Sequence, residues 1–552
     1  RFGREIVSSV PWAEAGDKVT YTTYRDQTQA DPDILTQWVT LTATAAELWR
    51  ADYTYVEENH VRRVEKRTTA LGEGNVRLEV KESWLGTAPN VYARGRLKMK
   101  QGMDGIQTHY FYEETDQYGA LYKVTAETRI AGESVPGLSS RKVTYVSGQG
   151  NNMRYEQYAR LADGAWSMTD ASSYEYDVEN RWVKRTRANG RVYERMMTCC
   201  GPLWERDENG VTTSYSYNTA RQLVETIRSA VADGETMITP ETITSYTRDA
   251  LGKITSLRRD AGPMTTVESR EYDLLGRLIR ETDILGRTTV RSYSGDGLVE
   301  TVTTPAGATL ITRKSPSGAV VRRYGTGQQD ILYTVEATAE GIRTTEAVPG
   351  GEGGAPRVVT GSSTVNGFGD LVRIAAANTL NGENVRTLAY DDKGRLIREQ
   401  LADMAPTLYA YDAFGNRTRA IVALEDEPTI LNSRITDYAY VAESREDGIY
   451  RLVSITSYTS SGTPVLQKRA ALLSALSSVL AGKTVMTDPR GHDTVEWTEY
   501  GGGSVRLQKK TVPGVGSVAL TRVVDGFTTA VTGFDGATAR RQRTYTETGI
   551  TY

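Results

Sequence analysis

The stretch Tyr272-Asp273-Leu274-Leu275-Gly276-Arg277-Leu278 decides how this chain folds. Its second half recurs soon afterwards as Asp283-Ile284-Leu285-Gly286-Arg287-Thr288. Asp favours the first position of a type I turn, where its side chain accepts hydrogen bonds from backbone amides, and Gly takes the fourth position with a positive φ. A type I turn followed by such a bulge closes a β-hairpin. The stretch therefore predicts a hairpin whose flanking strands carry the Tyr and the residues after the Arg.

The same spacing recurs at Tyr390-Asp391-Asp392-Lys393-Gly394-Arg395-Leu396, at Tyr411-Asp412-Ala413-Phe414-Gly415-Asn416-Arg417 and, in a shorter form, at Asp249-Ala250-Leu251-Gly252-Lys253. One Asp-x-x-Gly alone is an ordinary turn. Several copies with a Tyr before and a basic residue after predict a tandem array, in which each hairpin needs its neighbours for stability. The residues assigned to these turns are Asp249, Gly252, Asp273, Gly276, Arg277, Asp283, Gly286, Arg287, Asp391, Gly394, Asp412 and Gly415.

The composition agrees with an all-β fold. A chain of 552 residues is too long for one core, because single cores stop growing at about 250 to 300 residues. Thr, Val, Tyr and Gly recur throughout, and the 32 Tyr against 6 Phe suit sheets with one face in water. The 66 basic and 69 acidic residues nearly cancel, so a nucleic acid partner is not expected. No apolar stretch approaches the roughly 18 residues of a membrane span.

The repeats divide the chain into two predicted regions. Residues 1–170 are β-rich without a clear copy of the motif, and we interpret them as a divergent stretch of the same sheet. Residues 171–552 form the repeat region, with a Gly/Pro-rich loop near 348–356. Residues 466–480 are the best helical window, with a buried strand pair as the alternative. Both ends read as the interior of a longer polypeptide, so any export signal is expected outside this sequence.

At the Tyr-Asp pairs of residues 272–273, 390–391 and 411–412, the sequence resembles the Rhs/YD-repeat family. This family includes bacterial Rhs proteins, the shell-forming components of Tc toxins and the teneurin extracellular region. The motif covers residues 205–500 well and identifies a hairpin type rather than a biological role. The resemblance implies a spiralling β-sheet that forms a hollow shell or part of one, often around an unfolded or toxic C-terminal polypeptide, in exported bacterial proteins.

Two local features have chemical alternatives. Cys199 and Cys200 are adjacent, and we favour two thiols in a tight turn. The alternative in an oxidising compartment is a disulfide, either within the pair, where it would be strained, or to another chain. Asp488-Pro489-Arg490-Gly491 resembles the Asp-Pro-x-Gly near the self-cleavage point of Rhs proteins, but His492 stands where that family has Leu. We favour a hairpin turn there, because Pro fits the second turn position and Gly the fourth.

The sequence predicts a structural protein and not an enzyme. The three His and two Cys are too few and too scattered for a metal site, and no phosphate loop or nucleophile elbow is recognisable. We expect no cofactor. The predicted role is a structural shell or scaffold of an exported or cell-surface protein, with an enclosed polypeptide or a surface partner. The alternative is a cell-surface adhesion or glycan-binding protein, since seven of the eight Trp lie at or before Trp204.

Overall fold

The chain folds into one long antiparallel sheet. The computed structural model describes residues 7–11, 17–24, 33–41, 47–208, 210–233, 236–316, 318–349, 358–378, 382–402, 404–424, 433–459, 461–475, 480–500, 505–512, 516–523, 528–532, 538–540, 544–546 and 549–551. Forty-two strands share the sheet, and neighbours in the sheet are neighbours in the sequence. The predictions of an all-β fold and of tandem hairpins are confirmed.

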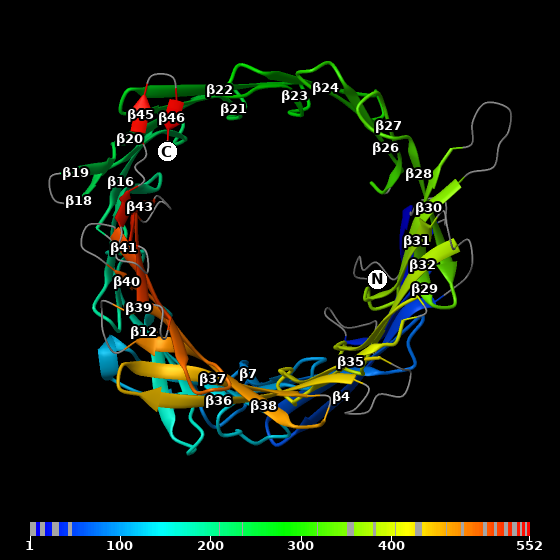
Figure 1. Cartoon of the computed structure of the whole chain (residues 1–552). Coiled ribbons are helices and arrows are strands. Elements are labelled where there is room, and N and C mark those ends of the chain that lie inside the picture. The colour runs from blue at the N-terminus through cyan, green and yellow to red at the C-terminus, as the bar shows by residue number, and fades with distance from the viewer. Residues whose placement is uncertain are drawn as a thin grey trace.

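The sheet curves into an open ring and then passes alongside itself (Figure 1). We call β1–β27 the first circuit and β28–β44 the second circuit. The first circuit consists of β1 (Val7–Pro11), β2 (Asp17–Tyr24), β3 (Ile34–Leu41), β4 (Glu47–Glu58), β5 (Val61–Ala70), β6 (Arg77–Trp84), β7 (Leu97–Gln101), β8 (Gln107–Glu114), β9 (Tyr122–Arg129), β10 (Ser140–Val146), β11 (Asn152–Arg160), β12 (Trp166–Tyr176), β13 (Trp182–Arg187), β14 (Val192–Met197), β15 (Pro202–Arg206), β16 (Thr212–Tyr217), β17 (Leu223–Arg228), β20 (Thr242–Arg248), β21 (Ile254–Ala261), β22 (Met264–Tyr272), β23 (Leu278–Thr282), β24 (Thr288–Tyr293), β25 (Val299–Thr303), β26 (Thr309–Lys314) and β27 (Val320–Tyr324).

The second circuit consists of β28 (Ile331–Thr338), β29 (Gly341–Val348), β30 (Val358–Val365), β31 (Leu371–Asn378), β32 (Gly382–Tyr390), β33 (Leu396–Leu401), β34 (Thr407–Tyr411), β35 (Arg417–Ala423), β36 (Ser433–Arg445), β37 (Gly448–Tyr458), β38 (Pro464–Ala475), β39 (Leu480–Thr487), β40 (Asp493–Tyr500), β41 (Val505–Val512), β42 (Gly516–Val523), β43 (Thr528–Thr532) and β44 (Thr538–Arg540). Two small hairpins stand apart from the sheet, β18 (Val231–Asp233) with β19 (Thr236–Thr239) and β45 (Thr544–Thr546) with β46 (Gly549–Thr551). A 3-10 turn lies at Gln117–Gly119. Within the described ranges, no helix is long and apolar enough to cross a membrane.

The sheet is a thin wall and has no common core. Each of the four clusters of buried apolar side chains in the described part of the chain contains three residues. The surface area is 30722 Å² for a mass of 60.8 kDa, whereas a compact monomer of this mass would expose about 20,000 Å². The chain therefore leaves roughly half as much surface again in water as a globular protein would.

Along β22 the burial alternates residue by residue between half-buried and exposed. Its half-buried face carries long side chains such as Glu268, Arg270 and Tyr272, whereas Thr265 and Val267 lie on the exposed face. Long polar side chains bury their stems while their charged ends stay in water. On this face of the wall, the stems of long polar side chains therefore cover the sheet and take the place of a second layer.

The seam is the set of contacts where turns of the second circuit meet turns of the first. The amide of Gly367 donates to the carbonyl of Leu71 at 2.7 Å, and a Cβ on Gly367 would overlap the carbonyl oxygen of Leu48. Farther along, the amide of Ala162 donates to the carbonyl of Ala442 at 3.1 Å. Close backbone approach of this kind requires glycine or a small residue at the contact.

Apolar and charged side chains also cross the seam. Val39 and Leu48 of the first circuit form one buried cluster with Ile342 of the second. Arg77, 8% exposed, forms an ion pair with Asp370 and stacks 3.8 Å from the centre of the Phe368 ring. Arg77 therefore joins two segments that lie 293 residues apart in the sequence.

Three sequence expectations need comment. The prediction of a helix at residues 466–480 is wrong over the part that the structure describes, because β38 pairs with both β37 and β39. This pairing buries Ala470 in a cluster with Tyr450 and Val485. The sheet runs without a break through position 171, which lies inside β12, so the division there stays a prediction about sequence repeats. Most of the expected Gly/Pro loop, residues 350–357, lies outside the described residues.

We expect Arg77→Ala to weaken the seam. Removing one partner of a buried ion pair costs about 3 to 5 kcal/mol, and because Asp370 is 22% exposed we expect about 2 kcal/mol here. Urea unfolding combined with hydrogen exchange would measure the loss, which should concentrate at residues 340–370. The matched control is Arg67→Ala, because Arg67 is 62% exposed on the strand next to that of Arg77. Equal unfolding midpoints for the two variants would contradict the assignment of Arg77 to the seam.

Candidate functional site

The repeated turn is the most regular polar arrangement in the chain. Asp273 follows β22, and its backbone carbonyl accepts from the amide of Gly276 at 2.9 Å. Its carboxylate accepts from the amides of Leu275 at 3.0 Å and Arg277 at 2.9 Å through Oδ1, and from Nε of Arg277 at 2.7 Å through Oδ2. Gly276 has a φ of 75°. One carboxylate thus holds the whole turn and fixes the guanidinium of the residue that ends it.

The other turns assigned from the sequence share the two amide hydrogen bonds to the carboxylate and the glycine with positive φ. The carboxylates of Asp249, Asp283, Asp391 and Asp412 each accept two backbone amides within the turn. The side chains that complete the carboxylate contacts are Arg287, Arg395 and Asn416. The φ angles of the glycines are 82° at Gly252, 75° at Gly286, 78° at Gly394 and 79° at Gly415.

These hydrogen bonds lower the pKa values of carboxyl groups in the turns. The backbone amide of Arg277 is the main cause that lowers the pKa of Asp273, and the side chain of Arg287 has the same effect on Asp283. Hydrogen bonds and cations stabilise the ionised form of a carboxyl group. Asp273 and Asp283 are therefore held ionised, which suits a structural acceptor and not a general acid.

The Tyr of each repeat joins its hairpin to the preceding one. The hydroxyl of Tyr293 donates to the carbonyl of Leu278 at 3.1 Å, and the guanidinium of Arg277 lies 4.4 Å from the centre of the Tyr293 ring. In the same way, Tyr411 donates to Leu396 at 2.7 Å beneath Arg395. The turns of Asp273 and Asp391 therefore each position an Arg that covers a Tyr of the next hairpin. The Tyr-Asp-Arg set is a link between hairpins.

The structure contains turns of this type that sequence reasoning missed. Tyr176-Asp177 begins one, in which Oδ1 of Asp177 accepts from the amides of Glu179 and Arg181, and Asn180 takes the glycine position with a φ of 61°. Asn366 occupies the Asp position in the turn that contacts Arg77 at the seam, and its side-chain oxygen accepts two backbone amides of that turn. The signal was present in the sequence, because Asn tolerates the left-handed region and can also replace Asp as a turn acceptor.

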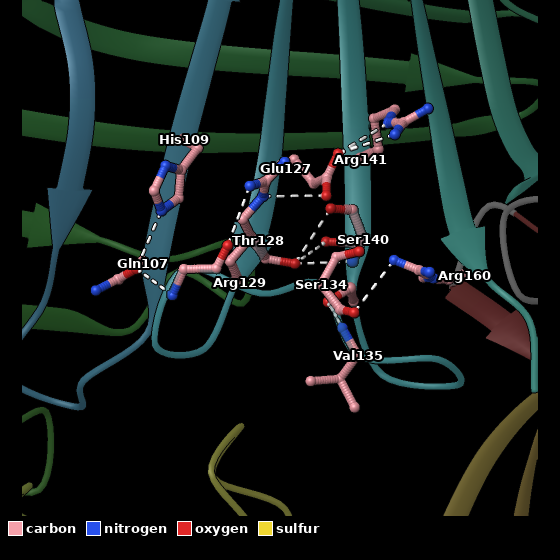
Figure 2. Close-up of polar contacts among 12 residues, drawn as sticks. Gln107, His109, Glu127, Thr128, Arg129, Ser134, Val135, Ser140, Arg141 and Arg160 are labelled. Atoms are coloured by element: carbon pink, nitrogen blue, oxygen red, sulfur yellow. Dashed lines mark hydrogen bonds and ion pairs between the residues drawn. The ribbon is translucent and has the colours of Figure 1, made fainter. Parts of the chain in front are cut away.

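A second polar network holds the connection between β9 and β10 (Figure 2). Glu127, whose side chain is 4% exposed, pairs with Arg129 at 3.2 Å and Arg141 at 2.9 Å. The amide of Ser140 donates to the Thr128 hydroxyl at 2.7 Å, and Arg160 donates to the carbonyl of Ser134 at 3.1 Å. This connection supports the seam, because a Cβ on its Gly137 would contact Val441 of the second circuit. We interpret the network as structural.

Two hollows flank these strands. One of about 800 Å³ is lined by polar side chains of β8–β13 and by Leu472 and Leu473 of β38. The other, of about 450 Å³, contains Glu127 and Glu156, and both carboxylates are bound by arginines. No group of three or more His, Cys, Asp or Glu in the described part of the chain could hold a metal ion.

The remaining sequence candidates lie in hairpin turns or pack against the sheet. Oδ1 of Asp488 accepts from the amides of Arg490 and His492, both at 2.8 Å, which is the geometry of the other turns. The hairpin turn that we favoured is present here, and self-cleavage stays the untested alternative. Trp12 lies outside the described residues. The six other early Trp are half-buried, and cationic side chains cover several of them. The guanidinium carbon of Arg195, for example, lies 3.5 Å from the centre of the Trp182 ring. Glycan binding by these Trp also stays a prediction.

We expect Gly276→Val and Gly415→Val each to destabilise the sheet locally, by about 1 to 3 kcal/mol. The cause is the backbone, because a β-branched residue tolerates a positive φ poorly, and at Gly415 no atom lies within 4 Å of the added Cβ. The matched control is Leu275→Ala, which should stay within about 0.5 kcal/mol, because Leu275 is 77% exposed. Urea unfolding of the purified variants decides, and unchanged midpoints for both glycine variants would refute the turn assignment.

We expect His109 to make the protein sensitive to mild acid. Burial, and then the nearby Arg129, lower the pKa of His109 below its ordinary value of 6.5. The unfolded state therefore binds the proton more readily, and stability falls as the pH drops below 6.5. Urea midpoints at about pH 8 and about pH 5.5 should differ less for His109→Gln than for the wild type. His60→Gln, at an exposed position, is the control, and identical pH dependence of wild type and His109→Gln would contradict the prediction.

Comparison with known proteins gives one family match and several matches to solved structures. The sequence profile of the family described as RHS Repeat matches residues 272–309, beginning at the Tyr of the clearest turn. TcdB2-TccC3 without its hypervariable C-terminal region matches over 97% of this chain and 35% of its own, with 11% identity and a TM-score of 0.30. The Photorhabdus luminescens Tc holotoxin pore matches over 96% and 34%, with 11% identity and a TM-score of 0.25.

The chain spans about a third of the length of these solved chains. No curated protein matches the sequence. The profile match falls on the turn whose Tyr, Asp, Gly and Arg recur along the sheet and link its hairpins. The family match shows that residues 272–309 are similar to an RHS repeat, and the hydrogen-bonded turn in that stretch recurs elsewhere in the sheet.

Proposed function

We propose that this chain forms part of the wall of a hollow container that encloses a polypeptide, in an exported protein of the toxin-carrying type. The observation that carries the proposal is the excess of exposed surface, 30722 Å² against about 20,000 Å² for a compact monomer. A chain that leaves so much surface in water on both sides of a single sheet gains little from its own packing. A sheet of this kind suits a container wall, in which one face lies toward the outside and the other toward an enclosed polypeptide.

The seam supports the same proposal. A curved sheet that only presented a surface for adhesion would need no contact between successive circuits. Here the second circuit is joined to the first by a backbone hydrogen bond at Gly367, a buried apolar cluster around Ile342 and the ion pair of Arg77. These contacts hold adjacent circuits together, as the wall of a container that retains a chain requires.

The side chains available for chemistry also favour a structural role. The carboxylates of the turns and of the β9–β10 network are occupied by amides and arginines. A carboxylate that already accepts amide hydrogen bonds and pairs with an arginine is poorly placed to exchange protons with a substrate. We therefore propose no catalytic activity for the wall itself.

We expect protection of an enclosed segment in the intact natural protein. Treatment of the native protein with a broad-specificity protease should leave one segment uncut although it lacks stable structure of its own, and electron cryo-microscopy should show density inside the ring. The variant Arg77→Ala should increase cutting of that segment, whereas Arg67→Ala should not, because only Arg77 lies at the seam. A compact particle with no internal density and no protected segment would overturn the proposal.

A further inference from the structure

Cys199 and Cys200 form a pair at an exposed hairpin tip. They lie in the turn between β14 and β15, and their sulfur atoms are 3.0 Å apart. Cys199 is exposed and Cys200 is half-buried. The chain has no other cysteine, so each thiol has only the other as a partner within this sequence. The turn lies at the same edge as those of Asp177 and Asp273, opposite the edge at which the first circuit meets the second.

The hairpin holds the two cysteines in a fixed relation. Thr198 closes the turn, because its amide and its hydroxyl both donate to the carbonyl of Gly201, at 2.7 and 2.8 Å. The amide of Cys200 donates to the same hydroxyl at 3.2 Å. On the sheet side, Gly201 lies directly against the hydroxyl of Tyr217, so that no Cβ would fit there. The pair is therefore supported on a firm base and faces water.

The surroundings distinguish the two thiols. The guanidinium of Arg181 donates to the carbonyl of Thr198, the residue before Cys199, at 2.9 Å. A hydrogen bond to Cys199 is the main cause that raises the pKa of Cys200. Cys200 therefore keeps its proton to a higher pH than an ordinary cysteine does. Cys199 is the more exposed of the two, and an accessible thiol reacts more readily, so Cys199 is placed to react first.

We propose that Cys199 and Cys200 are a redox-responsive dithiol that exchanges with low-molecular-weight disulfides, with Cys199 as the attacking and Cys200 as the resolving thiol. The Cys199 thiolate attacks one sulfur of the small disulfide, whose S–S bond breaks, and one thiolate leaves and takes up a proton. Cys200 then loses its proton and attacks the Cys199 sulfur, which releases the second small thiol. The two cysteine thiols are oxidised to one disulfide, and the small disulfide is reduced to two thiols.

The expected bond is a labile one. Adjacent residues lie closer together than the usual separation of disulfide-bonded cysteines, so the ring is strained. Strained and exposed disulfides have higher reduction potentials than structural ones. The pair thus suits reversible oxidation and not permanent cross-linking. Oxidation would change the shape of a tip at the free edge of the wall, while the hydrogen bonds of Thr198 and the ladder of β14 with β15 stay in place.

The test is intact-protein mass spectrometry after exposure of the folded protein to glutathione disulfide. We expect the wild type to lose two hydrogen atoms and to carry no glutathione. Cys200→Ser should retain one glutathione on Cys199, whereas Cys199→Ser should react several-fold more slowly, since its remaining thiol is less accessible. Phenylarsine oxide, which bridges paired thiols, should bind the reduced wild type and neither the oxidised protein nor the two variants.

Three results would overturn the proposal. They are two glutathiones retained on the wild type, a disulfide-linked dimer as the main product, and equal reaction rates of the two single variants. A failure of folding does not obscure the result, because the cysteines lie at an exposed tip and circular dichroism of the Ser variants reports the sheet directly. The result is also separable from the proposed wall function, since thiol exchange does not require an enclosed polypeptide.

Discussion

The hydrogen bond from a turn amide to an aspartate carboxylate is the interaction on which the rest of this structure depends. A single-layer sheet gains little from apolar burial, so its turns must be specified by polar contacts instead. At Asp273 one carboxylate satisfies two amides and orients Arg277, which in turn covers Tyr293 of the next hairpin. The same atoms therefore define both the bend within a hairpin and the link to its neighbour.

The seam adds the only order beyond that of neighbouring strands in the described part of the chain. Along the sheet, each strand contacts the strands before and after it in the sequence, as in a linear repeat protein. At the seam, Gly367, Ile342 and Arg77 bring together segments that are far apart in the sequence. Hydrogen bonds along the sheet build a ribbon, and the contacts across the seam convert the ribbon into a wall.

The sequence predicted the fold class and the repeat because both rest on local chemistry. Asp273, Gly276 and Arg277 are neighbours in the sequence, and their turn can be read without knowledge of anything else. Two kinds of error had physical causes. The turn at Tyr176-Asp177 was overlooked because Asn180 replaces the glycine, and the helical window around Ala470 was misread because apolar residues with high helix propensity form a strand once both neighbours pair with it. Arg77 could not be recognised at all, since nothing near it in the sequence indicates a partner 293 residues away.

The great sequence distance across the seam also bears on how the chain acquires its structure. Hairpins close within a few residues and are entropically inexpensive, whereas bringing Arg77 to Asp370 closes a loop of nearly three hundred residues. If each hairpin formed on the edge left by the previous one, the curvature of the ribbon would carry residue 370 to Arg77 without a search through unfolded conformations. Assembly from the N-terminal end, in step with synthesis on the ribosome, would then be the natural order, and a defect early in the ribbon would misalign everything laid down after it.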